Sequence, residues 1–119
     1  MSDEALRDAL AAAAAELAAF AAARDWQQFH TPKNLAMSLA IEAGEVMEHF
    51  QWTDATSPLD ESVRGAVALE LADVMSYLLR LASVLDIDLA AALRAKLAIN
   101  EQRYPVEKAR GSAAKYDAL

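Results

Sequence analysis

Acidic side chains recur at intervals of three along residues 39–52, where apolar residues surround them. The stretch reads LAIEAGEVMEHFQW and contains Glu42, Glu45 and Glu48. Side chains three apart on an α-helix lie on one face, about 4.5 Å apart along the axis. If this stretch is helical, its carboxylates repel one another, so the arrangement needs a physical reason.

A second pair with the same spacing, Glu70 and Asp73, follows in ALELADVMSYLL, with 24 residues between Glu45 and Glu70. Glu42 and Glu70 each interrupt an apolar track at helical spacing. The first track is Leu35, Leu39, Val46 and Phe50, and the second is Val67, Val74, Tyr77 and Leu81. Both acids are therefore expected to point into the helical core, not simply into water.

Carboxylates that leave water need a positive partner or a proton. Lys33 and Arg80 are the nearest basic residues in the sequence, and neither clearly shares the face of the acids. A divalent cation with oxygen ligands would balance the charge. Because the chain has no Cys and only two His, Mg²⁺ or Mn²⁺ is favoured over Zn²⁺. The expected ligands are Glu42, Glu45, Glu70 and Asp73.

Two other interpretations were weighed against this metal site. A solvated acidic face is the usual explanation of one such pair, but it suits two pairs within apolar tracks less well. A di-iron bundle needs Glu-x-x-His pairs, whereas His49 follows Glu45 by four residues and no second pair exists. Glu48 stays open as a ligand, a proton acceptor or a surface acid.

Four helices are predicted to position these acids, at about residues 2–24, 32–51, 58–85 and 88–104. Helix starts are expected at capping residues, and Pro105 ends the last helix. The capping residues are Ser2, Thr31, Ser57 and either Asp86 or Asp88, with Asp60 as a capping-box acid. The predicted fold is an all-α, four-helix up-and-down bundle in one domain, residues 1–104, followed by an irregular tail, residues 105–119. Ala-rich helices and 55% hydrophobic residues favour self-association.

Composition excludes several classes of function. A net charge of -7 argues against binding polymeric nucleic acid, which requires Lys and Arg. The absence of Cys excludes disulfides. No apolar run approaches the roughly 20 residues of a membrane span. The Ala-rich start carries Asp3, Glu4 and Glu16, unlike a signal peptide. A soluble cytoplasmic protein is expected, without membrane partners.

Three segments resemble the MazG-like all-α nucleotide pyrophosphohydrolases, and in particular their dCTP pyrophosphatase-like branch. They read RDWQQFHTPKNLAMSLAIEAGEVMEHFQW, LELADVMSYLLRLA and KLAINEQRYP, and the resemblance runs from about Phe20 to Tyr116. It implies a Mg²⁺-dependent hydrolase that converts dCTP, or a related or modified pyrimidine deoxynucleotide, to monophosphate and pyrophosphate in nucleotide-pool house-cleaning. It also implies a homo-oligomer, with a tetramer favoured over a dimer.

The resemblance also implies roles for individual residues. It assigns metal binding to Glu42, Glu45, Glu70 and Asp73, and it places Trp26, His30, Trp52 and Tyr77 around the base and sugar. Nucleotide contacts are further expected from Lys96, Asn100 and Arg103, and from the tail residues Lys108, Lys115 and Tyr116. Leu17 stands where this branch has a His, which leaves the base preference open.

The residue types suggest a division of chemical tasks. Glu45 or Glu48 could accept the proton of an attacking water, and Lys96, Arg103 and Lys115 could stabilise the leaving pyrophosphate. The aromatics Trp26, Trp52 and Tyr77 are favoured for base stacking, and Phe29 and Phe50 for core packing. Two alternatives remain: a non-catalytic nucleotide- or metal-binding module, and a related hydrolase acting on dUTP or phosphoribosyl-ATP.

Overall fold

The computed structural model describes residues 1–119, and helices are its only regular secondary structure. The α-helices are α1 (Asp3–Ala23), α2 (Pro32–Glu48), α3 (Glu61–Val84), α4 (Leu89–Arg103) and α5 (Val106–Ala109). Two 3-10 turns, η1 (Gln27–Phe29) and η2 (Tyr116–Ala118), complete the chain. The predicted all-α fold class is therefore confirmed. None of the helices combines the length and apolar character needed to cross a membrane.

Three predicted helix starts are capped by the expected side chains. Ser2 accepts a hydrogen bond from the backbone N–H of Ala5 at 3.0 Å. Thr31 and Asp88 accept equivalent bonds at 3.2 Å and 3.1 Å. Each cap satisfies a backbone donor that the first helical turn leaves unpaired, and these caps set where α1, α2 and α4 begin.

The start of α3 was predicted too early. The helix begins at Glu61 with Asp60 as its N-cap, rather than at Ser57 and Pro58. Asp54 accepts hydrogen bonds from the backbone and hydroxyl of Thr56, both at 3.0 Å, and Ser57 N–H donates to the Asp54 carbonyl. In this local turn the polar groups of Thr56 and Ser57 are hydrogen-bonded to Asp54 and are not available to start a helix.

Two further boundaries differ from the prediction. The helix expected to reach residue 51 ends at Glu48. Residues 49–53 continue as turns, in which the Phe50 N–H donates to the carbonyl of Met47, three residues earlier. The tail, predicted as irregular, contains α5 and η2.

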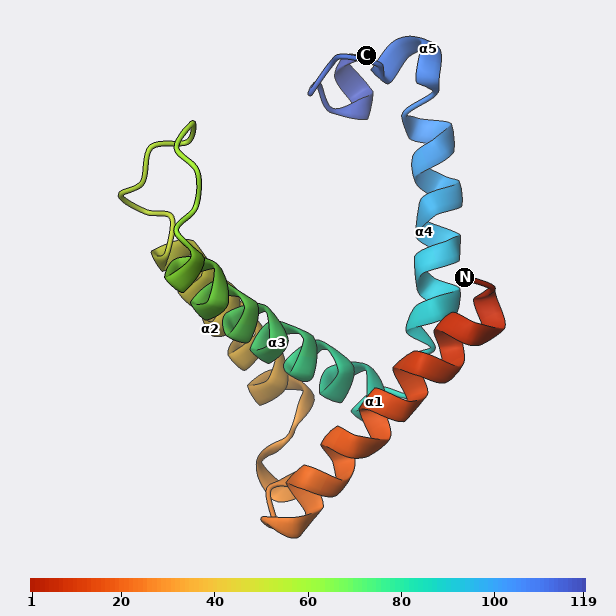
Figure 1. Cartoon of the computed structure of the whole chain (residues 1–119). Coiled ribbons are helices and arrows are strands. Elements are labelled where there is room, and N and C mark those ends of the chain that lie inside the picture. Colours follow the sequence, from red (N-terminus) through yellow and green to blue (C-terminus); the bar gives the residue numbers. More distant parts are fainter.

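The helices form an open V in which one arm is a helical hairpin (Figure 1). α2 and α3 pack along each other in that arm, and α1 crosses the C-terminal end of α3. α4 packs against α1 and continues away from the hairpin as the second arm. The radius of gyration is 17.6 Å, whereas a compact chain of this length would have about 13–14 Å. One chain therefore does not close a four-helix bundle on itself.

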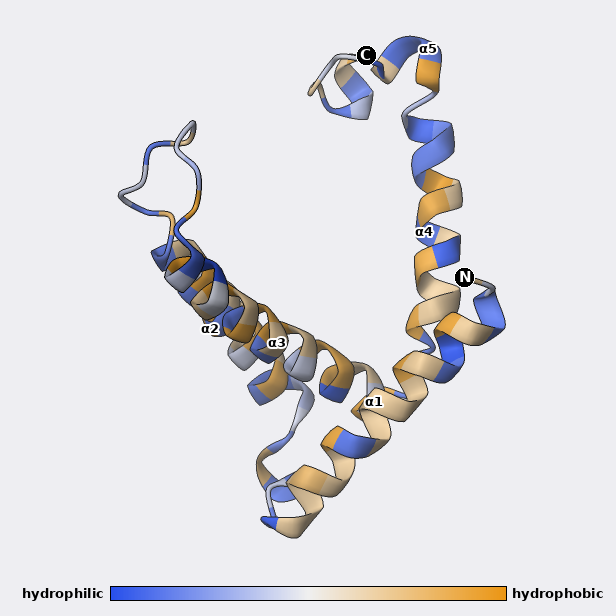
Figure 2. Ribbon diagram, in the orientation of Figure 1, coloured by the Kyte–Doolittle hydropathy of each residue, from blue (hydrophilic) through white to orange (hydrophobic).

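Burial within one chain is correspondingly slight. Only seven of 119 residues are buried, and these are Ala21, Leu35, Val67, Leu79, Arg80, Ala82 and Ala90. Large apolar side chains remain open, among them Leu69, which is 72% exposed, and Met47, which is 71% exposed. Hydrophobic residues are visible along helices of both arms (Figure 2). Soluble monomers rarely leave so much apolar surface uncovered.

The ends of α1 and α3 generate a stability prediction. Asp25 and Asp86 both have φ of 54°, a left-handed conformation that costs residues with a Cβ about 1–2 kcal/mol. Asp86→Gly should raise the free energy of unfolding by roughly 0.5 kcal/mol, and Asp86→Val should lower it by about 1 kcal/mol. Urea unfolding at one protein concentration measures both.

Asp25→Gly serves as the matched comparison for Asp86→Gly. Asp25→Gly should raise the free energy of unfolding by less than Asp86→Gly, because it also removes the carboxylate that accepts a 3.0 Å hydrogen bond from Gln28 Nε2. A valine variant at position 86 as stable as the wild type would contradict this assignment of strain.

Candidate functional site

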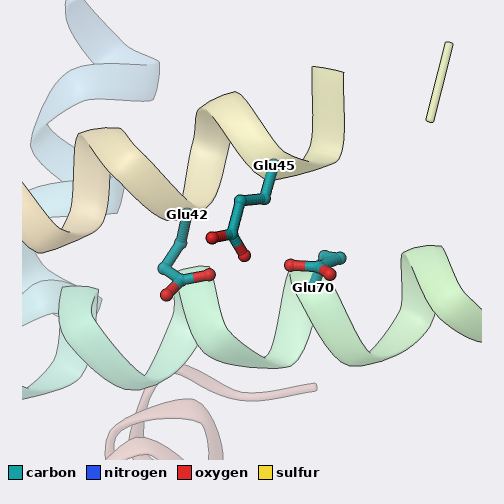
Figure 3. Close-up of side chains that lie close together, drawn as sticks. All are labelled: Glu42, Glu45 and Glu70. Carbon is teal, nitrogen blue, oxygen red and sulfur yellow. The ribbon is translucent and has the colours of Figure 1, made fainter. Parts of the chain in front are cut away.

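Three carboxylates converge between the two helices of the hairpin. α2 supplies Glu42 and Glu45, and α3 supplies Glu70; one oxygen from each lies within 4.8 Å of the others. All three side chains point into the space between the helices (Figure 3). The three-residue spacing on α2 and the packing of α2 against α3 together account for this cluster.

The cluster leaves polar atoms without partners. Glu42 Oε2 and Glu70 Oε2 are both buried, and no donor of the protein reaches them while the three carboxylates are ionised. Hydrogen bonding with the Glu45 carboxyl, followed by burial and the charges of Glu45, Asp73 and Glu70, raises the pKa of Glu42 to about 7. Hydrogen bonding with Glu45 and then burial also raise the pKa of Glu70. These carboxylates therefore hold a proton, or a cation in its place.

Asp73, the fourth predicted ligand, lies outside this group of three. Its side chain is exposed one turn after Glu70 on α3, yet its charge contributes to the raised pKa of Glu42. The structure thus brings three of the predicted ligands together and leaves Asp73 at the edge of the cluster. Glu48 is exposed at the end of α2 and is not part of the group.

His49 belongs to the cluster although it was not predicted as a site residue. Its Nε2 lies 3.7 Å from Glu70 Oε1, and this contact partly offsets the rise in the pKa of Glu70. A signal was present in the sequence, since His49 follows Glu42 by seven residues and Glu45 by four. These spacings place all three side chains on one helical face.

The donor set fits a hard divalent cation. Carboxylate oxygens from two helices, two of them buried without partners, match the ligands that Mg²⁺ and Mn²⁺ take. A cation would satisfy the orphaned oxygens and remove the mutual repulsion that raises the pKa of Glu42. The cluster therefore has the composition and burial of a metal site.

The predicted base-binding residues are spread over two elements and a loop. Trp26, beside η1, lies edge-on to Phe20 with ring centroids 5.8 Å apart. His30 ends η1 and is half-buried, Tyr77 is half-buried on α3, and Trp52 is 88% exposed in the loop after α2. The structure does not bring these four side chains into one closed pocket.

The remaining predicted contacts lie on the second arm of the V. The Arg103 guanidinium lies over the Tyr116 ring, 4.5 Å from the ring centroid. The Tyr116 ring is edge-on to that of Tyr104, with the two centroids 6.2 Å apart. Asn100 is half-buried. The other members of this group are exposed, and these are Lys96, Arg103, Lys108, Lys115 and Tyr116. Figure 1 shows α4 leading away from the C-terminal end of α3, so that α5 and the tail lie well apart from the α2–α3 hairpin that carries the acids.

The chain belongs to the MazG-like family, which it matches over residues 37–119. This result confirms the resemblance seen in the three sequence segments. The chain is also similar to curated proteins named dCTP pyrophosphatase 1. The mouse protein is 47% identical over 106 residues and the human protein 44%, with 86% of this chain covered in each case. The chain spans 62% of the length of these relatives.

A solved structure shares both fold and sequence with this chain. A pyrophosphatase from Archaeoglobus fulgidus superposes with a TM-score of 0.67 at 43% identity. The match covers 75% of this chain and 85% of that protein. At this identity the likeness extends beyond the arrangement of helices.

The raised pKa of Glu42 predicts how stability depends on pH. Without metal, the folded state holds a proton up to about pH 7 that the unfolded state releases near 4.5. Stability should therefore fall as pH rises from 4.5 to 7, by an amount on the order of 1 kcal/mol after solvent screening. Glu42→Gln should flatten this slope in thermal unfolding. A slope of the opposite sign that Glu42→Gln leaves unchanged would contradict the assignment.

Magnesium should reverse the effect, since metal ligands must be deprotonated. Its affinity should rise by up to about tenfold for each pH unit between 6 and 7 if one proton is released. Isothermal titration in two buffers of different ionisation enthalpy measures the proton release directly. Binding without proton release in this pH range would contradict the prediction.

Proposed function

We propose that this chain is a Mg²⁺-dependent nucleoside triphosphate pyrophosphohydrolase. It cleaves dCTP, or a related or modified pyrimidine deoxynucleotide, to the monophosphate and pyrophosphate, and so cleans the cytoplasmic nucleotide pool. The observation that carries the proposal is the cluster of Glu42, Glu45 and Glu70, with two buried oxygens that lack partners. The mouse and human relatives are named dCTP pyrophosphatases, and the archaeal structure is named a pyrophosphatase, which supports the proposal.

Each acid has a task in this proposal. Glu42, Glu45 and Glu70 hold the metal, and Asp73 joins them from the edge of the cluster. Bound Mg²⁺ would polarise phosphate oxygens and make a bound water more acidic. Either Glu45 or Glu48 accepts the proton of the attacking water, and Glu48 suits this task because it lies outside the ligand cluster, exposed at the end of α2.

The proposed active site is completed by a second copy of the chain. The nucleotide-contact candidates of α4 and the tail lie on the arm away from the acids of their own chain, and these are Lys96, Asn100, Arg103, Lys115 and Tyr116. Only seven residues are buried, so much apolar surface is available for association. We therefore propose a homo-oligomer, with a tetramer favoured over a dimer, in which residues 1–104 form the helical domain and the tail reaches a neighbouring site.

The base is proposed to stack on Trp26, Trp52 or Tyr77. A groove of about 370 Å³ between α1 and α3 passes beside Phe20, the ring against which Trp26 packs. Leu17 lines this groove and offers no hydrogen bond where the related branch has a His. The base is therefore chosen by shape and stacking as much as by hydrogen bonds, and dUTP and phosphoribosyl-ATP belong in any substrate test.

The activity is tested with a nucleotide panel in Mg²⁺ and in Mn²⁺, with products identified. Pyrophosphate and a monophosphate are expected, without orthophosphate. Glu45→Gln and Asp73→Asn should each lower kcat by about 10²–10⁴-fold, while Glu4→Gln, an exposed acid of α1, serves as the neutral control. Nucleotide binding without turnover anywhere in the panel would instead favour a non-catalytic binding module.

Completion by a second copy is tested by mixing two inactive variants. Glu45→Gln damages the acid cluster and Arg103→Ala damages the other arm, so a mixed dimer contains one intact site. Unfolding and refolding the two together should restore roughly a quarter of wild-type activity. Light scattering should show an oligomer. An active monomer, or no recovery in proven mixed oligomers, would contradict the arrangement.

A further inference from the structure

We propose that Arg80 is a positioning residue that holds His30 in its neutral Nε2–H tautomer and so anchors the Trp26–His30 segment to α3. Its consequence for nucleotide binding rests on the proposed function, in which Trp26 and His30 contact the base and sugar. The anchoring itself stands on contacts within the chain.

Arg80 is the only charged residue among the seven that are buried, at 9% exposure. Its Nε donates a 3.2 Å hydrogen bond to Nδ1 of His30. None of the ion pairs in the structure involves Arg80. A buried guanidinium normally requires a carboxylate, so this arginine is unusual in having a ring nitrogen as its acceptor.

The direction of this bond fixes the state of the imidazole. Arginine has donors only, so Nδ1 of His30 must carry a lone pair and the ring proton must sit on Nε2. A second proton on Nδ1 would set two donors and two positive charges against each other. His30 therefore presents an N–H donor on its far side, suited to an oxygen of a ligand.

The bond is also the only long-range hydrogen bond of the α1–α2 connection. The other bonds of this segment are local, such as Trp26 N–H to the Ala21 carbonyl at 3.0 Å and Asn34 Nδ2 to the Phe29 carbonyl at 3.0 Å. They shape the turn but do not attach it to α3. Because Arg80 lies one turn after Tyr77 on α3, the bond fixes the placement of Trp26 and His30 relative to Tyr77.

The surroundings of His30 keep it neutral. Burial first, and then the charge of Arg80 on α3, lower the pKa of His30 below its ordinary value of 6.5. Arg80 is the only charged group that acts on the ring; no charged residue of α1 or α2 contributes. The anchor is therefore complete above pH 6.5 and is lost as acid protonates the ring.

The experiment is NMR of the full chain labelled with ¹⁵N-histidine, which contains only His30 and His49. His49→Gln assigns the two signals. We expect His30 to show the Nε2–H pattern and to titrate below pH 6.5. In Arg80→Met the tautomers should mix and the midpoint should rise toward 6.5, whereas Arg94→Met, which removes an exposed arginine of α4, should change neither.

An Nδ1–H tautomer in the wild type would overturn the proposal, even if Arg80→Met failed to fold. A His30 midpoint that Arg80→Met leaves unchanged would also overturn it. For nucleotide turnover, Arg80→Met should raise KM about tenfold with little change in kcat, most strongly above pH 6.5. The NMR result needs no turnover, so an inactive protein with the expected spectra would refute the proposed function alone.

Discussion

Mutual repulsion among Glu42, Glu45 and Glu70 opposes the packing of the hairpin and must be neutralised for the hairpin to be stable. Packing α2 against α3 brings their oxygens within 4.8 Å and leaves two of them buried without partners. Such a cluster destabilises the folded chain unless protons or a cation neutralise it. The fold thus carries a local cost that a bound divalent ion would remove, and this cost links the packing of α2 against α3 to the proposed metal-dependent chemistry.

The open V follows from where apolar side chains lie along the helices. α3 contributes four of the seven buried residues, because α1 and α2 both pack against it. α4 packs mainly against α1 and leaves Leu93 and Leu97 nearly half exposed. The acid cluster lies on the hairpin, whereas the basic nucleotide-contact candidates Lys96, Arg103 and Lys115 lie on the other arm. In the proposed enzyme these candidates therefore act on the acid cluster of a second copy. In the proposed oligomer, the apolar surface that one chain leaves uncovered is buried between copies and brings those groups to the acids of a neighbour.

Local rules predicted much of the fold and part of the site. Capping by Ser2, Thr31 and Asp88 could be read from the sequence because a cap involves only residues three apart. The convergence of Glu42, Glu45 and Glu70 followed from helical periodicity. The late start of α3 was missed because the Asp54 turn competes with a helix start, and no spacing rule ranks the two. The sequence shows Arg80 only as one of the basic residues nearest to the acids, because its bond to His30 spans fifty residues and no local rule predicts it.

Glu42 and His30 are both half-buried, and acid changes the stability of the folded state in opposite directions through them. Their contributions to the pH dependence can therefore be separated. Acidification from pH 7 toward 4.5 stabilises the folded state through Glu42, whose pKa is raised to about 7. Below pH 6.5 it destabilises the same state through His30, whose pKa is lowered. Without metal these contributions oppose each other, so the net fall of stability between pH 4.5 and 7 is smaller than the contribution of Glu42 alone. Magnesium bound as proposed would displace the Glu42 proton and remove the first contribution. The pH dependence that persists in magnesium therefore reports the Arg80–His30 anchor, while the difference between the two profiles reports the acid cluster.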